Sequence, residues 1–406
     1  MRNRLLSLIA AMVLTLSAYA INIETDRTWY LSGEAMEISV TDDDAIIAYA
    51  ELCDTHGLAA GVAVSLEGGH GTGVLELPSN LHSGYYVLSV YTRHNTQVSQ
   101  KLIAVVNPLH KSKDDDIQWI SNDSLSYSSI AEGDGFSMAD LVSKKAADVR
   151  EIEGHIIKAR VKNSHEGKTF SGRQIRPFLS IIGKQIHYFE GQMVNDSTAV
   201  FYTFGVQGKQ PMVLSAMSST EVSLPIEIIS PFATLLPKQL PHLVFHYNRS
   251  EVEARSLDMQ RHQKMMPQPK PFDYNEMAYG TTPDLSYNLD EYRQFLTIRE
   301  VLLEYVSCVK RTTIDDVPQL IVRKEQEVYN NNIPTLTLID GMPVYDVERL
   351  LNYDARRVHY INIYAGQYTF GNSLYNGILS FVTRSGQLTN YPTEPGMQYL
   401  VYDFPE

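Results

Sequence analysis

The sequence predicts a mainly β protein in which serial β-sandwiches are followed by a small α+β unit. Short segments of alternating apolar and polar residues recur from residue 21 onward, and Gly, Pro, Asn and Asp separate them. Tyrosine is abundant, with 25 Tyr against 2 Trp, which favours strands and amphipathic surfaces. The 406 residues suffice for about two to four domains at roughly 150 residues each.

The composition excludes several classes of function. Lys and Arg total 34 and Asp and Glu total 47, giving a formal net charge of −13, whereas a nucleic-acid-binding protein needs a basic patch to neutralise phosphates. With 2 Cys, the chain cannot hold a disulfide scaffold or a zinc site built from cysteines. A hydrophobic fraction of 44% and a charged fraction of 20% are typical of packed globular domains, which argues against wholesale disorder.

Residues 1–20 have the pattern of a secretory signal peptide. Arginines precede an apolar run, Leu5–Leu16, and Ala18-Tyr19-Ala20 matches a cleavage site. We expect cleavage before Ile21 and export of the mature chain; an uncleaved membrane anchor is the alternative, although the apolar run is short for a spanning helix. No later stretch predicts a membrane-spanning helix, so we expect an exported protein that is soluble or peripheral to a membrane.

Two stretches are expected to fold as β-sandwiches. In residues 21–108, the run Met36–Val40 alternates between apolar and polar side chains, and further strand-like runs are separated by turn signals at intervals typical of a sandwich. Residues 151–230 show the same kind of pattern and predict a second sandwich. Between them, residues 109–150 are richer in Ser, Asp and Lys and predict a linker, with or without the remnant of another strand module.

Residues 231–288 are rich in Pro and Tyr and predict an irregular arm that wraps around its neighbours. Tyrosine offers a large amphipathic contact area, so the Tyr-rich segment 274–305, which begins in this arm and continues past it, is either a partner-binding surface or a packing surface for the chain's own domains. Both interpretations stay open. The tyrosines concerned are Tyr274, Tyr279, Tyr287 and Tyr292.

Residues 289–406 predict the α+β unit. Thr297 and Glu300 fit a capping box, and the apolar residues that follow recur with helical spacing, which predicts a helix. A second, short helix is expected at Val347–Leu351. Tight turns between strands are expected at Asp340-Gly341 and Asn376-Gly377.

The first predicted sandwich contains a set of motif residues with a characteristic order and spacing. They are Thr25-Asp26-Arg27, Tyr30, Gly33-Glu34, Ala50-Glu51-Leu52, Leu77-Pro78, Ser83-Gly84-Tyr85-Tyr86 and Tyr91-Thr92. This set resembles the MG2 module of the α2-macroglobulin family over nearly all of 21–108, and residues 151–230 are more loosely similar to a carboxypeptidase-regulatory-like or macroglobulin-like sandwich. The resemblance implies immunoglobulin-like or macroglobulin-like sandwiches. It does not imply thioester trapping of proteases, because the chain has no Cys-Gly-Glu-Gln motif.

A second set of residues lies between Ile333 and Gly386. They are Leu338-Ile339-Asp340-Gly341, Pro343-Val344, Ile361, Ile363, Tyr368, Phe370-Gly371, Asn376-Gly377-Ile378, Thr383, Arg384 and Gly386. This set resembles the plug domain of TonB-dependent outer-membrane receptors. Too few residues follow Gly386 for a membrane barrel, so we expect a plug-like domain without one, and the resemblance does not imply ligand transport by the chain itself.

Together the resemblances imply an exported protein of Gram-negative Bacteroidota, in which MG2-like modules precede a plug-like domain. The implied location is the periplasm or the periplasmic face of the outer membrane. The implied partner is an outer-membrane β-barrel or translocon protein, because a plug normally fills a barrel lumen that is lined by polar groups.

No catalytic residue, cofactor or metal is expected. The sequence has no G-x-S-x-G, H-E-x-x-H, P-loop, G-x-G-x-x-G or C-x-x-C motif. His242 and His246 would share one face of a strand and approach one metal, or simply form its wetter face; no third ligand is suggested nearby.

The runs Asp42–Asp44 and Asp114–Asp116 lack the spacing of a calcium loop and fit solvated turns. Cys53 and Cys308 are two separate thiols or a bridge.

We therefore expect a non-enzymatic binding or scaffolding protein whose plug-like domain docks to an outer-membrane barrel or translocon, as a secretion or transport accessory. The alternative is an exported polysaccharide-binding protein or hydrolase, which would need carboxylates gathered in a cleft. Its candidate carboxylates are scattered in sequence: Glu51, Glu153, Asp196 and Asp340. The candidate interaction residues, whose other possible role is to shape turns, are Asp340, Gly341, Tyr368, Phe370, Gly371, Asn376 and Gly377.

Overall fold

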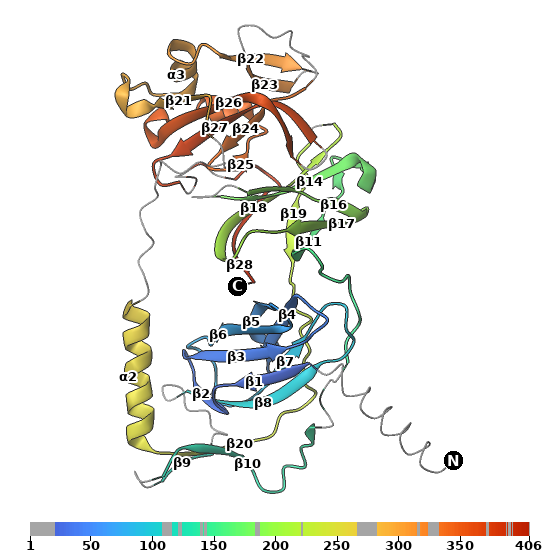
Figure 1. Ribbon diagram of the computed structural model, residues 1–406, viewed down its shortest axis with the longest axis vertical. Coiled ribbons are helices and arrows are strands. Elements are labelled where there is room, and N and C mark those ends of the chain that lie inside the picture. Colours follow the sequence, from blue (N-terminus) through green and yellow to red (C-terminus); the bar gives the residue numbers. More distant parts are fainter. Residues whose placement is uncertain are drawn as a thin grey trace, which may run out of the picture. The chain divides into compact units, whose positions relative to one another are not determined.

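The structure is a computed structural model of the chain (Figure 1). It describes residues 21–107, 116–120, 124–138, 141, 144–182, 187–220, 222–265, 282–314, 317–323, 333–370, 373–386, 388, 391 and 393–405. The expected signal peptide, 1–20, lies outside this set. The chain divides into two compact units: the first comprises Met1–His155, Pro231–Gln268 and Asp403–Glu406, and the second comprises Ile156–Ser230 and Pro269–Tyr402.

The first unit is built on a β-sandwich of two sheets, coloured blue to cyan in Figure 1. One sheet has the strand order β2-β8-β7-β4-β5 and the other β1-β3-β6. Every second residue of β3 is buried and the intervening ones are exposed, so the alternation in the sequence correctly predicts the face that packs on the core. The strands are β1 (Asn22–Thr25), β2 (Trp29–Leu31), β3 (Ala35–Thr41), β4 (Ile47–Cys53), β5 (Leu58–Ser65), β6 (His70–Glu76), β7 (Gly84–Tyr91) and β8 (Ser99–Val106).

Three short strands and a helix complete the first unit, and they come from the stretches expected to be a linker and an irregular arm. β20 pairs antiparallel with β10 and parallel with β9, so part of 231–288 is a strand rather than irregular, and the linker 109–150 does contain short strands, as its second interpretation allowed. The helix α2 has few apolar residues, which hides it from a search for helical periodicity. The bounds are β9 (Asp116–Trp119), β10 (Tyr127–Ile130), β20 (Leu243–Tyr247) and α2 (Arg249–Met265).

The second unit contains another β-sandwich, with sheets of order β16-β17-β11-β19 and β15-β14-β18-β28. Strand β28 comes from the C-terminal end of the chain, far in sequence from the strands it joins. The bounds are β11 (His155–Val161), β12 (Ser164–His165), β13 (Lys168–Thr169), η2 (Gly172–Gln174), β14 (Ile175–Ile181), β15 (His187–Glu190), β16 (Gln192–Asn195), β17 (Thr198–Thr203), β18 (Gly208–Ser218), β19 (Ile226–Ile229) and β28 (Gln398–Phe404).

The second unit also contains the α+β part, a five-stranded sheet of order β21-β26-β27-β24-β25 with the hairpin β22-β23. Thr297 and Glu300 exchange the hydrogen bonds of a capping box at the start of α3, and α4 occupies the expected residues, so both predicted helices are confirmed. The bounds are β21 (Leu285–Asn288), η3 (Leu289–Glu291), α3 (Ile298–Glu304), β22 (Val309–Ile314), β23 (Val317–Val322), β24 (Leu336–Ile339), β25 (Met342–Pro343), α4 (Val347–Leu351), η4 (Ala355–Arg357), β26 (Val358–Phe370) and β27 (Ser373–Thr383). Across the described residues, no helix is long and apolar enough to cross a membrane.

The turn predicted at Asn376-Gly377 is wrong. Both residues lie inside β27, opposite a register shift between Tyr364 and Gln367 of β26. Gly377 has φ +97°, and a Cβ at this position would lie 3.1 Å from the Cβ of Val322 and 3.2 Å from the carbonyl oxygen of Tyr364. The conformational freedom of this glycine serves a β-bulge in a continuous strand rather than a chain reversal.

Candidate functional site

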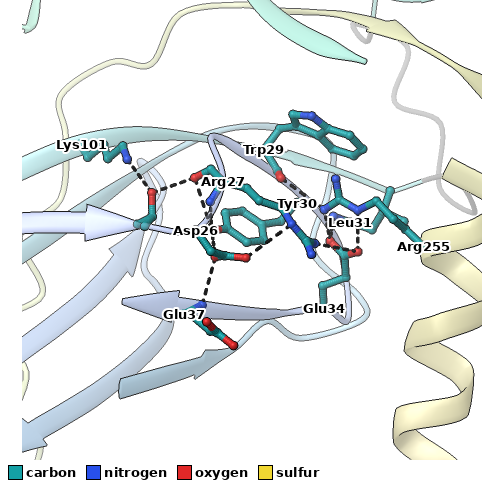
Figure 2. Close-up of polar contacts among 10 residues, drawn as sticks. Asp26, Arg27, Trp29, Tyr30, Leu31, Glu34, Glu37, Lys101 and Arg255 are labelled. Carbon is teal, nitrogen blue, oxygen red and sulfur yellow. Dashed lines mark hydrogen bonds and ion pairs between the residues drawn. The ribbon is translucent and has the colours of Figure 1, made fainter. Parts of the chain in front are cut away.

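The residues that carry the MG2-like resemblance form a network of polar contacts around β2 (Figure 2). The Tyr30 hydroxyl donates to Asp26 Oδ1 at 2.5 Å, and the same carboxylate oxygen accepts from the Glu37 backbone amide at 3.2 Å. Glu34 accepts from the Leu31 backbone amide at 2.7 Å and so closes the turn after β2. These contacts hold the strand-turn-strand geometry around β2. The motif residues therefore have a structural role in the fold.

Arg255, from helix α2, joins this network (Figure 2). Its Nε and Nη2 atoms donate to the two carboxylate oxygens of Glu34 at 2.9 and 2.5 Å, a bidentate ion pair. The guanidinium also lies 3.7 Å from the centroid of the Trp29 ring, within cation–π range. The helix packs so closely that a Cβ on Gly33 would lie 2.9 Å from Met259 Sδ. Helix α2 is therefore attached to the sandwich through a specific, largely desolvated contact.

Glu51, another MG2-like residue, is fully buried in β4. Its carboxylate accepts from the Tyr91 hydroxyl at 2.8 Å and from the backbone amides of Thr234 and Leu235 at 3.0 and 2.5 Å. These donors replace the water that the carboxylate loses on burial. Glu51 thus holds the segment that leads into β20 against the sandwich.

A second buried polar cluster lies in the first unit, and no sequence pattern signalled it. The Tyr49 hydroxyl lies 2.8 Å from both Glu151 carboxylate oxygens, and His155 Nδ1 and Arg93 Nε lie 3.1 and 3.6 Å from Glu151 Oε1. Burial lowers the pKa of His155, while its hydrogen bond to Glu151 acts in the opposite direction. The side chains of Arg93, Glu151 and His155 are only 6%, 3% and 4% exposed, so the cluster stabilises the fold rather than meeting a substrate.

The histidines considered as metal ligands have other contacts. The ring of His246 stacks on Tyr127, with centroids 4.5 Å apart and planes 23° apart. His242 precedes β20 and donates its backbone amide to Asp134. Among the residues that the structure describes, no group of three or more His, Cys, Asp or Glu side chains is placed to hold a metal ion.

The aspartate runs and the cysteines have local explanations. Asp42 accepts from the Asp44 backbone amide at 2.9 Å, as in a turn. The run Asp114–Asp116 lies outside the described residues, apart from the backbone of its last member. Cys53, in the first unit, and Cys308, in the second, are free thiols. Burial, helped by nearby carboxylates, raises the pKa of the Cys53 thiol to about 12, so this thiol stays protonated at neutral pH.

The predicted interaction pair Asp340-Gly341 is buried in the tight turn between β24 and β25. The φ angles of +48° and +91° are the left-handed values that such a turn needs, so the predicted turn is confirmed. The Asp340 carboxylate accepts from the Thr383 amide at 2.7 Å, the Thr383 hydroxyl at 2.5 Å and the Leu388 amide at 2.7 Å. Burial raises the pKa of this carboxyl, and the hydrogen bonds act against that shift. The pair therefore anchors the end of β27.

The other predicted interaction residues lie toward the opposite end of the β26–β27 hairpin, so the structure does not gather all seven into one site. Tyr368 is half-buried, with its ring edge-on to Tyr364 at a centroid distance of 6.3 Å. Asn376-Gly377 occupies the bulge described above. Phe370 ends β26 and its side chain lies outside the described part of the chain, as does all of Gly371.

This hairpin extends past the strands that flank it. β21 pairs with β26 over Tyr360–Ile363, and β24 pairs with β27 over Ile378–Phe381. Beyond them, β26 and β27 continue as a pair through four opposed residue pairs, the first of which is Gln367 with Asn376. Among the described strands, no third strand pairs with this part of the hairpin. At about 3.3 Å per residue, the free ribbon is about 10 Å long.

The Tyr-rich stretch divides into two parts. Tyr274 and Tyr279 lie outside the described residues. Tyr287 and Tyr292 have ring centroids 6.2 Å apart, and Tyr292 lies 4.6 Å from Tyr305 by the same measure. The described part of the stretch therefore packs within the α+β part of its own unit.

The carboxylates considered for hydrolysis are divided between the two units. Glu51 and Glu153 belong to the first unit, and Asp196 and Asp340 belong to the second. Asp196 accepts from the Gly172 backbone amide at 2.8 Å. Three of the four therefore have structural hydrogen bonds, and Glu153 is exposed on the surface.

Fold and contacts together define a mainly β protein of serial sandwiches with an α+β part. No protein-family model and no curated protein matches the chain. Solved structures similar to it include Escherichia coli α2-macroglobulin activated by porcine elastase, at 11% identity and TM-score 0.20, covering 54% of this chain and 20% of that one.

Two further similar structures have comparable values. The BSP domain of a biofilm associated protein has 11% identity and TM-score 0.19, with 52% of this chain and 30% of that chain covered. Fibronectin(III)-like modules of Clostridium thermocellum CbhA have 9% identity and TM-score 0.16, with 56% and 93% covered. The chain thus spans under a third of the macroglobulin and the biofilm protein. Because these TM-scores are low, the assignment of the sandwiches rests on the strand pairing within the chain.

Proposed function

We propose that the chain is a non-enzymatic, exported binding protein of the Gram-negative envelope. In this proposal its α+β part docks to an outer-membrane β-barrel or translocon protein, and its sandwiches act as spacers. The observation that carries the proposal is the ribbon formed by the free end of the β26–β27 hairpin. One face of the ribbon is packed through Tyr375, which is 8% exposed, and the other face carries the exposed Leu374. A two-stranded ribbon at the end of a sheet can enter a lumen or add to a partner's strands through such an exposed face and through edges that pair with no third described strand.

The chemistry of the ribbon suits a protein partner. Tyr368 contributes a half-buried aromatic ring near its base, and Leu374, on the opposite strand, is 42% exposed. Interfaces favour aromatic and apolar anchors of this kind, surrounded by polar groups such as the Gln367 and Asn376 side chains. The sheet behind the ribbon is fixed by the buried Asp340 turn, so the ribbon is presented from a rigid base.

Two features of the sequence support the proposed location of the chain and the proposed type of partner. The expected signal peptide at 1–20 directs the chain out of the cytoplasm. The residues between Ile333 and Gly386 that resemble a receptor plug suggest a barrel as the target, by analogy of fold. Origin in Bacteroidota belongs to the same proposal.

The test is a mild-detergent affinity purification of the tagged full-length chain from its own envelope, read by mass spectrometry. We expect stoichiometric recovery of one outer-membrane barrel protein. Leu374→Glu should lower that recovery about tenfold, the effect of losing roughly 1.4 kcal/mol from an interface. The matched control is Leu303→Glu, because Leu303 is 80% exposed in the same unit and belongs to α3 rather than to the hairpin.

Recovery of the wild-type chain alone, as a soluble monomer, would overturn the proposal. So would equal recovery with both variants, because the ribbon would then have no part in docking.

A further inference from the structure

The second unit contains a cavity of about 550 Å³. It lies between the outer face of the β14–β18 sheet and the α+β part, and strands of both contribute to its wall: β14, β15 and β18 from the sandwich, and β23, β24, β25 and β27 from the α+β part. This volume falls in the range of about 300–1,000 Å³ that is typical of small-molecule sites. The free ribbon of the hairpin contributes Tyr375 to the wall of the cavity.

One end of the cavity is aromatic. The rings of Phe178 and Tyr188 stack with centroids 5.2 Å apart, and Tyr345 and Tyr375 complete this wall from the α+β part. The Tyr345 hydroxyl lies 3.3 Å from Ser215 Oγ. Burial raises the pKa of Tyr188 and Tyr345 well above the ordinary value, so the phenols are neutral at physiological pH. This end is therefore uncharged and apolar; Tyr345 is its partly exposed ring, whereas Phe178, Tyr188 and Tyr375 are at most 9% exposed and form the packed base behind it.

The other end is polar and cationic, and the strand register places it. Arg176 lies opposite Met217 and Phe178 lies opposite Ser215, so these side chains share one face of the sheet. The turn after β18 brings Ser219 to the Arg176 end. Among the described residues that line the cavity, Arg176 is the one with a formal charge.

The register also sets a length. From Arg176 to Phe178 is two residues along β14, and Tyr188 is opposite Ser180, two residues further. At about 3.3 Å per residue, the aromatic wall begins about 7 Å from the cation and extends to about 13 Å. Apolar residues of the α+β part, Leu320, Leu336 and Val344 among them, face the same space.

We propose that this cavity binds an amphipathic molecule with one acidic group and an aliphatic or aromatic body about 7–13 Å long, the acid at the Arg176 end and the body against the aromatic wall. An uncharged sugar fits less well, because it offers no counter-charge to Arg176. The ribbon contributes one buried ring, Tyr375, to the wall, but the polar end at Arg176 and Ser219 involves no ribbon residue, so the inference does not depend on the docking role proposed for the ribbon.

The test is isothermal titration calorimetry of the purified mature chain with decanoate, a monoanion with an aliphatic body, and with decyltrimethylammonium, its cationic counterpart. We expect saturable binding of one decanoate, at least about tenfold tighter than binding of the cation. Arg176→Gln should weaken decanoate about fivefold, the effect of one partly exposed ion pair. Arg173→Gln is the matched control, because Arg173 is an exposed arginine of the preceding η2 turn that does not line the cavity.

A second variant keeps the proposal testable if the charge effect is small. Ser219→Trp places a large ring at the exposed rim without changing a buried residue, and it should abolish decanoate binding while leaving the melting temperature unchanged. Equal affinity for the anion and the cation, unchanged decanoate affinity in both Arg176→Gln and Ser219→Trp, or no saturable binding by the wild-type chain would each overturn the proposal.

Discussion

The guanidinium of Arg255 lies 3.7 Å from the centroid of the Trp29 ring, so helix α2 and strand β2 share one desolvated cation. The same guanidinium neutralises Glu34, whose side chain is 9% exposed. A helix that has little apolar surface of its own is thereby attached to the sandwich by a contact of high specificity.

Arg255→Gln should lower the free energy of unfolding of the first unit by about 2 kcal/mol, because it removes the cation–π contact and leaves the Glu34 carboxylate without its bidentate partner. Amide hydrogen exchange in α2 should rise at the same time. The control is Arg261→Gln on the same helix, because Arg261 is 72% exposed and its loss should change stability by no more than about 0.5 kcal/mol. Equal effects of the two variants in urea unfolding would contradict this account.

Glu51→Gln should destabilise the first unit by about 3 kcal/mol. The glutamine side chain keeps one acceptor oxygen, but its NH2 group faces the backbone N–H of Thr234 or Leu235. In the wild type, the Glu51 carboxylate accepts a hydrogen bond from each of these N–H groups. Tyr91→Phe removes a hydroxyl that contacts the same carboxylate, and it should cost less, about 1 kcal/mol. Limited proteolysis should show faster cleavage near residue 235 in Glu51→Gln; protection equal to that of the wild type would show that the carboxylate does not hold this segment.

The stability of the first unit should depend on His155 below pH 6.5. Burial lowers the pKa of folded His155 from its ordinary value of 6.5, so the unfolded chain binds a proton at a higher pH than the folded chain does. Stability contributed by the neutral ring is complete above pH 6.5 and is lost as the pH falls from there toward the folded pKa, with a slope of at most about 1.4 kcal/mol per pH unit.

The measurement is urea unfolding at several pH values between 5 and 8 for the wild type and for His155→Asn, whose side chain does not titrate. The variant should be less stable at pH 8 but should lose less stability on acidification. His56→Asn is the control, because His56 is 89% exposed, and its pH profile should match that of the wild type. Parallel profiles for the wild type and His155→Asn would exclude His155 as the source of the dependence.

Asp340→Ala should destabilise the second unit by about 3 kcal/mol, because it removes the acceptor for the Thr383 amide, the Thr383 hydroxyl and the Leu388 amide in a buried turn. Asp340→Asn should cost less, about 2 kcal/mol, because asparagine tolerates φ +48° and keeps one acceptor oxygen, although its NH2 group then faces the Thr383 or the Leu388 backbone amide. Thermal unfolding with hydrogen exchange at the end of β27 checks both values. If the asparagine variant is as unstable as the alanine variant, the carboxylate does more than accept hydrogen bonds.

The helices differ in how far local sequence predicts them. α3 and α4 begin at polar caps, Thr297 and Asp346, and bury apolar residues at helical spacing, so a short window contains the whole signal. In α2 the apolar signal is nearly absent, and its docking depends on Arg255, whose partners are more than 220 residues away in sequence. The one local sign was Asn248, whose side chain accepts from the Glu251 backbone amide at 3.2 Å at the start of the helix.

The candidate site shows the same division. Asp340-Gly341 forms the turn that the dipeptide predicts, because both residue types tolerate the positive φ values that such a turn needs. Asn376-Gly377 carries the same local signal, but the pairing of β27 with two neighbours extends the strand through it and converts the turn into a bulge. The cavity near Arg176 had no sequence signature, because its walls come from strands that lie far apart in the chain.

The contacts of Glu51 have a consequence for the order in which the chain can fold during synthesis. The Leu235 amide that its carboxylate accepts from is 184 residues further along the chain, and strand β20 and helix α2 follow after that. Until those residues have left the ribosome, the nascent sandwich contains a carboxylate without its backbone partners and lacks the helix that binds Glu34. The first unit therefore cannot finish folding before most of the second sandwich has been synthesised. Its N-terminal sandwich stays incomplete during that time, so the two units do not fold strictly one after the other along the chain.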